Sequence, residues 1–561
     1  MGSVPGVNVP QAGVMPALSR RDLFSASLFV VAGAAATTVT GQNAPAAAVA
    51  DPAATRFSHG VASGDPLPDG ILLWTRVTPS PADVPGSGLG ADVSVTWEVA
   101  EDSGFLRQAA SGTVITGSAR DHTVKVVPTG LQPGTRYWYR FTSGGVTSPV
   151  GRTKTAPAVG AALDQLRMGV VSCANLQAGF FTAYRHLADR GDLDVVLHLG
   201  DYLYEYGVGE YQARDVVVRP HDPPVEMTTL EHYRRRHAQY KADADLQALH
   251  AAVPFIVTWD DHESANDAWE DGAQNHTEGA EGAWTVRKAA SQQAYAEWMP
   301  VRYELGGELY RRFSFGSLAS VSMLDLRSYR SEQASNVASS EISDPNRTIT
   351  GAKQMDWLLD GFSQADTQWK LVGNPVMITP VRFPSTLSTA EIGGLQTLLG
   401  STTIDGVPYN IDQWDGYTAD RSRVVRHLRD RGISDTVFVT GDIHSGWACD
   451  IPADPLTYPT TGTSVATELV CTSVTSDNLD DILGVPPRTG SLAVENAVTA
   501  ANPHVKYLDF DSHGFSVLTV TPAAVRMDWY VLSERTSPMS TSSLSTSFRV
   551  AAGTQKVEAI A

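Results

Sequence analysis

The sequence predicts an α/β protein in which a small all-β domain precedes a larger catalytic domain, and three patterns support this fold class. Five short apolar runs rich in β-branched residues each close on Gly, Asn, Asp or Cys, as buried strands do. Helical periodicity appears between these runs, for example in LEHYRRRHAQYKADADLQALHAA. Residues 57–157 instead alternate Thr, Val, Trp and Tyr with turn residues, which is typical of antiparallel strands.

The chain begins with a segment that resembles a twin-arginine export signal. Arg20 and Arg21 precede an alanine-rich apolar stretch, and Ala48-Val49-Ala50 matches an A-x-A cleavage site. A membrane-spanning helix is the alternative, but glycine and threonine interrupt the stretch and no basic stop follows it. We therefore expect a signal peptide over residues 1–50, export by the twin-arginine (Tat) machinery, and a secreted, extracellular or cell-envelope location. We expect no transmembrane segment in the mature chain.

Residues 51–157 are expected to form the small N-terminal domain. The stretch LQPGTRYWYRF resembles the tyrosine-bearing corner of a fibronectin- or immunoglobulin-like β-sandwich. Such a domain either binds a partner or flanks the catalytic domain, and the second role is common for sandwiches. Residues 158–532 would then form the catalytic domain, and residues 533–561 a Ser/Thr-rich C-terminal tail without a recognisable motif.

Each of the five runs ends on side chains that can hold a metal ion. In chain order they are Cys173, Asp201 with Tyr204, Asp261 with His262, Asn374, and Asp442 with His444. Ligands of open α/β sheets gather outside the carboxyl ends of the strands, so these residues are expected to converge on one site.

Taken singly, each motif has a simpler explanation. Gly-Asp after a strand commonly marks a turn, and a lone cysteine such as Cys173 is commonly a small buried apolar residue. The segment Asp260-Asp261-His262-Glu263 is different, because its carboxylates repel one another unless a cation or an arginine lies nearby. The combination of GDxxY, DDHE and GDxH favours a metal site.

The series SCAN, GDYLYEYG, WDDHESAN and GDIHSGW resembles the PhoD-type alkaline phosphatases, a branch of the calcineurin-like metallophosphoesterases related to purple acid phosphatases. The resemblance covers the chain from Phe57 onward. It implies a metallophosphoesterase β-sandwich core flanked by helices. It also implies an exported, metal-dependent alkaline phosphatase or phosphodiesterase that hydrolyses phosphate esters with metal-activated hydroxide.

The resemblance further implies a ligand set in which Asp201 bridges two unlike cations. One site holds iron(III) in the family, and the residues implied here are Cys173, Tyr204 and His444. The other holds calcium, and the residues implied are Asp261, Asn266 and Asp442, with Asn374 at a position where the wider superfamily has a histidine. The residue chemistry agrees, because a thiolate with a phenolate suits iron and anionic oxygens suit a hard cation such as calcium.

Two residues are candidates for catalysis, and neither is a nucleophile. Asp201 acts as the bridge, and His262 either transfers a proton to the leaving group, stabilises charge on the phosphoryl group or supports a neighbouring ligand. Arg185, in a helix expected after SCAN, contacts phosphate or lies on the surface.

The formal net charge of −19 at pH 7 disfavours nucleic acid and anionic membranes as partners. The expected substrate is a small phosphate ester. Phospholipid is the alternative, as for secreted phospholipase D enzymes of the same family, and an open apolar mouth lined by Trp259, Trp269 or Trp447 would favour it. An extracellular metal-stabilised binding protein is the remote alternative.

The cysteine count is three, so at least one thiol is unpaired in an exported protein. Cys449 and Cys471 either form a disulfide or remain buried thiols.

Overall fold

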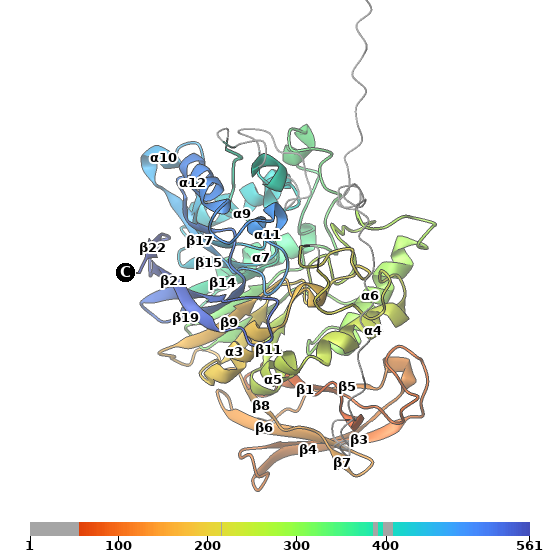
Figure 1. The fold of residues 1–561 in the computed structure, drawn as a ribbon. Helices are drawn as coiled ribbons and strands as arrows, with labels where there is room; N and C mark the ends of the chain where they lie inside the picture. The colour runs from red at the N-terminus through yellow and green to blue at the C-terminus, as the bar shows by residue number, and fades with distance from the viewer. Residues whose placement is uncertain (1–54, 215, 385–386, 388–390, 396–407, 561) are drawn as a thin grey trace, which may run out of the picture.

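The computed structural model describes residues 55–214, 216–384, 387, 391–395 and 408–560, and the predicted export signal lies outside them. Its largest sheet has ten strands in the order β22-β21-β20-β19-β9-β10-β11-β1-β2-β5 (Figure 1). The bounds are β1 (Val61–Gly64), β2 (Leu72–Arg76), β5 (Thr123–Val126), β9 (Leu166–Val171), β10 (Val195–His198), β11 (Phe255–Val257), β19 (Gly514–Val520), β20 (Ala524–Leu532), β21 (Ser542–Ala551) and β22 (Val557–Ala559). Its central strands β9, β10 and β11 are parallel neighbours.

A second sheet has seven strands in the order β12-β13-β14-β15-β17-β16-β18. The bounds are β12 (Arg311–Phe315), β13 (Ala319–Met323), β14 (Trp369–Asn374), β15 (Thr436–Thr440), β16 (Gly446–Pro452), β17 (Ser464–Val470) and β18 (Val505–Asp509). Strands β13, β14, β15 and β17 run parallel to their neighbours in this series.

The two sheets face each other across one apolar core. Side chains of alternate positions point to opposite faces of a strand, so Val170 of β9 and Leu371 of β14 enter the shared core. The adjacent residues Val171 and Val372 instead pack against helices on the outer faces. The resulting layers are helix, sheet, sheet, helix, which confirms the predicted β-sandwich core flanked by helices.

The helices divide between the two outer faces. Those that pack on the ten-stranded sheet are α3 (Thr182–Arg190), α4 (Leu230–Lys241), α5 (Ala244–Ala252) and α6 (Trp284–Trp298). Those that pack on the seven-stranded sheet are α7 (Ala352–Gln364) and α9 (Thr418–Asp430). The remaining α-helices with described bounds are α10 (Tyr458–Thr461), α11 (Leu479–Leu483) and α12 (Ser491–Ala501).

The N-terminal part is built from strands, as predicted, but it shares a sheet with the rest of the protein. A separate five-stranded sheet contains β3 (Val93–Ala100), β4 (Gln108–Thr116), β6 (Arg136–Ser143), β7 (Val146–Thr147) and β8 (Gly151–Lys154). Strands β1, β2 and β5 pack on it from the end of the ten-stranded sheet. The hydroxyl of buried Tyr137 accepts a hydrogen bond from the backbone N–H of Gln132 at 2.9 Å, the geometry of a tyrosine corner. One layer of this sandwich is therefore the end of the ten-stranded sheet, which is called the catalytic sheet below because residues of the candidate site follow its strands β9, β10 and β11.

Residues 533–561 were predicted to form a C-terminal tail without a motif, and this prediction is corrected: the segment contributes two strands to the fold. Residues 542–551 form β21 and pair along their length with β20, and β22 pairs with β21. Apolar and polar residues alternate at the end of this Ser/Thr-rich segment, so Phe548 and Val550 point into the core between the sheets. The ten-stranded sheet therefore ends with the C-terminal strands.

Two further expectations concern cysteines and membranes. Cys173, Cys449 and Cys471 are all buried and free, so the alternative of buried thiols is confirmed and the disulfide is not formed. Across the described residues, none of the helices has the length and apolar character needed to cross a bilayer.

Candidate metal centre

Side chains that follow four strands, β9, β10, β11 and β15, meet at one edge of the sandwich. Three overlapping groups have candidate ligand atoms within 4.8 Å of one another. The groups are Cys173, Asp201 and His444; Asp201, Asp261 and His262; and Asp201, Asp260, Asp261 and Asp442. Asp201 belongs to all three, because β10 lies between β9 and β11 and its carboxyl end opens toward both neighbours.

The backbone at this edge is strained in a way that concentrates on the predicted ligands. Cys173, Asp201, Asp442 and His444 all have left-handed backbones, with φ of 60°, 53°, 66° and 52°. Left-handed φ is uncommon for residues with a side chain and clusters at functional sites. Strands β9, β10 and β15 are therefore each followed by a sharp turn that redirects the next polar side chain.

Cys173, Tyr204 and His444 lie together beside the Asp201 carboxylate. The Tyr204 hydroxyl donates to Asp201 Oδ2 at 3.0 Å and lies 3.3 Å from His444 Nε2. The Cys173 sulfur lies 2.7 Å from the Ser172 hydroxyl. Burial, with Asp201 and Asp442 nearby, raises the pKa of the Cys173 thiol well above its ordinary range. A thiolate here therefore requires a cation.

The second half of the cluster contains only oxygen ligands and one imidazole. Asp261 Oδ2 accepts the backbone N–H of Asp267 at 2.6 Å, whereas Asp261 Oδ1 and Asp201 Oδ1 are buried without a hydrogen-bond partner among the described residues. Burial raises the pKa of Asp201 and Asp442 well above the ordinary range. Buried polar atoms are nearly always bonded, so unpartnered carboxylate oxygens fit a position that takes a cation.

Asn266 follows Asp261 in the turn after β11. Its side-chain nitrogen donates to Gln274 at 3.0 Å, and its backbone N–H donates to Glu205 at 2.8 Å. These bonds hold the backbone and the amide nitrogen of Asn266, whose role as a ligand stays a prediction.

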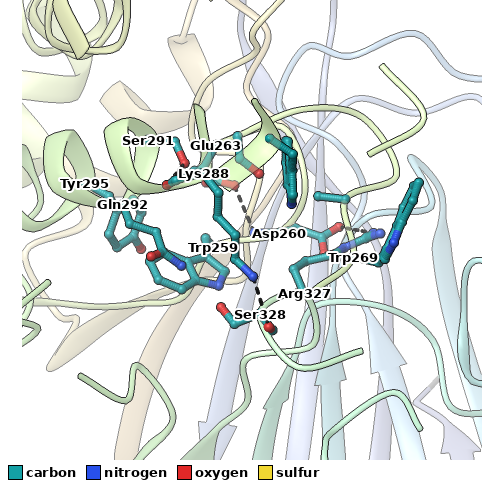
Figure 2. Close-up of a pocket in the computed structure, with 13 residues that line it drawn as sticks. Trp259, Asp260, Glu263, Trp269, Lys288, Ser291, Gln292, Tyr295, Arg327 and Ser328 are labelled. Carbon is teal, nitrogen blue, oxygen red and sulfur yellow. Dashed lines mark hydrogen bonds and ion pairs between the residues drawn. The ribbon is translucent and has the colours of Figure 1, made fainter. Parts of the chain in front are cut away.

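Arg327 explains why Asp260 and Asp261, although adjacent, are not equivalent. Its guanidinium pairs with both oxygens of Asp260, at 2.6 and 3.0 Å (Figure 2). It also pairs with both oxygens of Asp412, at 2.9 and 2.8 Å. The nearest Asp261 oxygen is 3.8 Å away. Asp260 therefore has the close bidentate pairing, whereas Asp261 has only a longer contact with the same guanidinium.

Glu205 and Glu263 bond to the cluster, and no role was predicted for either residue although GDYLYEY and DDHE contain them. Glu205 accepts from His262 Nδ1 at 2.7 Å. Burial would lower the pKa of His262, but Asp261, Glu205 and Asp201 raise it well above its ordinary value. Glu263 accepts the backbone N–H groups of Asp201 and Asp260 at 3.2 and 2.8 Å, so it joins two ligand-bearing turns.

Asn374 and Arg185 do not have the expected surroundings. The Asn374 amide nitrogen donates to Val376 and Thr440, and its oxygen accepts from Trp414 at 3.2 Å. Both ends of the amide thus serve internal bonds, and Asn374 is removed from the proposed ligand set. Arg185 pairs with both oxygens of Asp245 at 2.7 Å and its side chain is 37% exposed, which agrees with the alternative of a surface arginine.

The tryptophans expected to line a lipid-accepting mouth are mostly internal. Trp259 and Trp447 are 5% and 0% exposed, and the Trp259 indole donates to Asp325 at 2.8 Å. Trp259 and Trp269 line a cavity of about 20 Å³ beside Asp260 (Figure 2), which is room for about one water molecule. These residues do not form an open apolar mouth.

The sandwich of two sheets, with acidic, thiol and imidazole side chains gathered at one edge, defines a hydrolase of the phosphoesterase class. A family model described as PhoD-like phosphatase matches residues 168–529, and its N-terminal domain model matches residues 42–157. The chain is 37% identical to alkaline phosphatase D of Bacillus subtilis (strain 168) over 503 residues, which cover 88% of this chain and 80% of that protein. A solved structure titled "Structure of PhoD" superposes with a TM-score of 0.79 at 34% identity, covering 90% of this chain and 92% of that one.

The chain belongs to the PhoD-like phosphatase family, as its motifs predicted, and is a phosphatase that hydrolyses phosphoric esters. This outcome disfavours the phospholipase alternative and the non-enzymatic binding protein.

Proposed function

We propose that this phosphatase acts on small phosphate esters at a centre of two unlike cations bridged by Asp201. The observation that carries the proposal is the membership of Asp201 in all three groups of candidate ligand atoms. A bridging carboxylate with separate ligands on each side is the arrangement that two-metal hydrolysis requires.

The donor set supports two different cations. Cys173, Tyr204 and His444 supply sulfur, phenol oxygen and imidazole nitrogen, which suit iron. Asp261, Asp442 and Asn266 supply oxygens only, which suit calcium. Iron(III) and calcium are therefore the metals we assign, in agreement with the family resemblance.

Charge also favours bound cations. Arg327 is shared between Asp260 and Asp412, so it does not balance Asp201, Asp261 and Asp442 fully. Bound cations would supply the missing charge, neutralise phosphoryl oxygens and lower the pKa of an attacking water. The carboxylates hold this charge in place, and the turns at the strand ends orient them.

His262 is the residue we assign to proton handling. Glu205 holds its Nδ1, so Nε2 is the ring nitrogen that could meet an ester oxygen. As an imidazolium it would stabilise the phosphoryl group and protonate the leaving oxygen. No step requires a side-chain nucleophile.

Export is a further part of the proposal. The Arg20-Arg21 motif and the Ala48-Val49-Ala50 site support passage of the folded chain through the twin-arginine machinery to the cell envelope or the exterior.

The test compares the wild-type protein with Asp201→Asn on nitrophenyl phosphate, its bis-ester and phosphatidylcholine. We expect the wild type to hydrolyse a nitrophenyl ester, to leave phosphatidylcholine intact and to lose activity on chelation. Asp201→Asn should lower kcat at least about 1,000-fold, because the bridge and one anionic charge are lost. Asp245→Asn, which breaks the pair with Arg185 away from the cluster, is the control. Normal turnover by Asp201→Asn would refute the two-cation centre.

A further inference from the structure

The loop that follows β17 bonds to three residues of the sulfur-containing half of the centre. The Ser476 hydroxyl lies 2.6 Å from the Tyr204 hydroxyl and 3.0 Å from the Cys173 carbonyl, and its single proton is shared between these two acceptors. The Asp477 carbonyl lies 2.8 Å from His444 Nδ1 and can accept its proton. With Nδ1 protonated, the lone pair of Nε2 is left on the side where Tyr204 lies. The loop therefore sets the orientation of the phenol and of the imidazole.

Arg535, beyond β20, holds this loop from the other side. Its side chain is 4% exposed. The guanidinium donates to the Thr475 carbonyl and to the Asp477 carboxylate, and it lies 2.9 Å from the Asp481 carboxylate. Its own carbonyl accepts the backbone N–H of Phe180 at 2.9 Å. The residues on either side of Ser476 are thus both bonded to one arginine.

We propose that Arg535 is a positioning residue for the cation site formed by Cys173, Tyr204 and His444. It acts through the loop: the ion pair with Asp477 fixes the carbonyl that orients His444, and the bond to Thr475 fixes the turn that carries Ser476. This inference rests on the proposed two-cation function. Groups that orient metal ligands typically contribute 10- to 100-fold to metal affinity.

The chemistry of arginine is specific to this task. The planar guanidinium donates in several fixed directions at once, which lets it bond a carbonyl and two carboxylates. Lysine would keep the positive charge between Asp477 and Asp481 but could not reproduce this fork. Arg535→Lys therefore separates the effect of the positive charge from the effect of the guanidinium geometry.

A purely structural role for Arg535 is the rival explanation, and Arg234 provides the matched control. Arg234 is also buried, at 7% exposure, and also pairs with both oxygens of a carboxylate, Glu297, while donating to the Ala119 carbonyl. Neither partner is a predicted ligand. Loss of Arg234 should lower the Tm without changing metal affinity.

The experiment titrates chelator-treated full-length protein with Co²⁺ and follows thiolate-to-cobalt absorption, which reports on the Cys173 site without turnover. Cys173→Ser should abolish the band. We expect Arg535→Met to weaken Co²⁺ binding about 10- to 100-fold, Arg535→Lys to weaken it less, and Arg234→Met to bind as the wild type does.

Two outcomes would count against the proposal in different ways. Wild-type affinity in both Arg535 variants would overturn the role of Arg535 and leave the metal centre intact. A wild-type protein with no Cys173-dependent band would overturn the metal centre itself, and this inference with it.

If Arg535→Met does not fold, Asp477→Asn carries the test, because it removes the ion pair and keeps the carbonyl that faces His444. The Co²⁺ affinity of Asp477→Asn should fall below that of the control Arg234→Lys, and equal Co²⁺ affinities of the two variants would refute the proposal.

Discussion

At the scale of single residues, the site is organised by which carboxylates find a positive partner inside the protein. Asp260 finds Arg327, whereas Asp201 and Asp261 each keep a buried oxygen without a partner in the described part of the chain. Glu205 pairs with His262. Adjacent acids therefore have different tasks: one anchors an arginine, and the next is left for a cation.

The sequence indicated the clustered candidate ligands more readily than the residues that support them. GDxxY and GDxH could be read because they follow strands, and the repulsion expected within DDHE correctly required a cation or an arginine. The identity of that arginine was hidden, because Arg327 reaches Asp260 across 67 positions and Asp412 across 85. Such partners meet only after folding and leave no local pattern.

Glu205 should act through His262, and a double-mutant cycle tests this. We expect Glu205→Gln and His262→Ala each to lower kcat about 100-fold or more, because the imidazole loses its orienting acceptor or is absent. The double variant should be little worse than His262→Ala alone, since the effects of residues that work as a unit are not additive. Metal content by elemental analysis is the control. Additive losses, or a loss of metal that parallels the loss of kcat, would show that Glu205 supports ligands instead.

At the scale of elements, the strands bring the candidate ligands to one edge and the turns after them orient the side chains. The apolar runs predicted β9, β10, β11, β14 and β15 because buried parallel strands are short, apolar and end abruptly. The left-handed turns were not predictable in detail, since nothing in the residues Cys173 or His444 requires positive φ. Asn374 shows the limit of the strand-end rule: it ends β14 as expected, but its amide bonds to neighbouring protein groups.

Gly200 should be required for the turn that presents Asp201. Its φ is +112°, and a Cβ there would lie 2.5 Å from the Asp260 Cβ and 2.8 Å from the Asp260 nitrogen. We expect Gly200→Ala to lower the unfolding free energy by at least about 2 kcal/mol, from strain and overpacking together, and to weaken metal binding.

Gly191→Ala is the matched control for this substitution. Gly191 has φ +67°, and a methyl group there would meet no atom of the described residues within 4 Å, its chain neighbours aside. Gly191→Ala should lower the unfolding free energy by about 1 kcal/mol and leave metal binding unchanged. Equal effects of the two substitutions in thermal melts and metal titrations would contradict the role assigned to Gly200.

At the scale of the whole molecule, both described ends of the chain build the catalytic sheet. Strands β1, β2 and β5 extend it on one side, and β21 and β22 on the other. The domain boundaries drawn from composition missed this sharing, because composition reports local preference and not which strands, far apart in the chain, pair with one another. Stability of the N-terminal strands and of the catalytic sheet is therefore expected to be linked.

Lys125 on β5 offers a measurement of that linkage through pH. Its ammonium bonds to the Ala296 carbonyl at the end of α6, at 2.7 Å, and burial lowers its pKa from 10.5 to about 8 despite Glu304 and Asp65 nearby. Between pH 8 and pH 10.5 the unfolded chain binds more protons than the folded one, so this residue's contribution to the unfolding free energy rises with pH.

The rise should reach at most about 3 kcal/mol, because the side chain is partly exposed to solvent. Denaturant unfolding of the wild type and of Lys125→Met, followed at about pH 7.5 and about pH 10, should show the wild type gaining stability relative to the variant as pH increases. Lys353→Met removes a lysine whose side chain is 80% exposed and should show no such change. If the difference in unfolding free energy between the wild type and Lys125→Met stays constant with pH, enough water reaches Lys125 to keep it charged. Strand β5 would then be only loosely packed against α6.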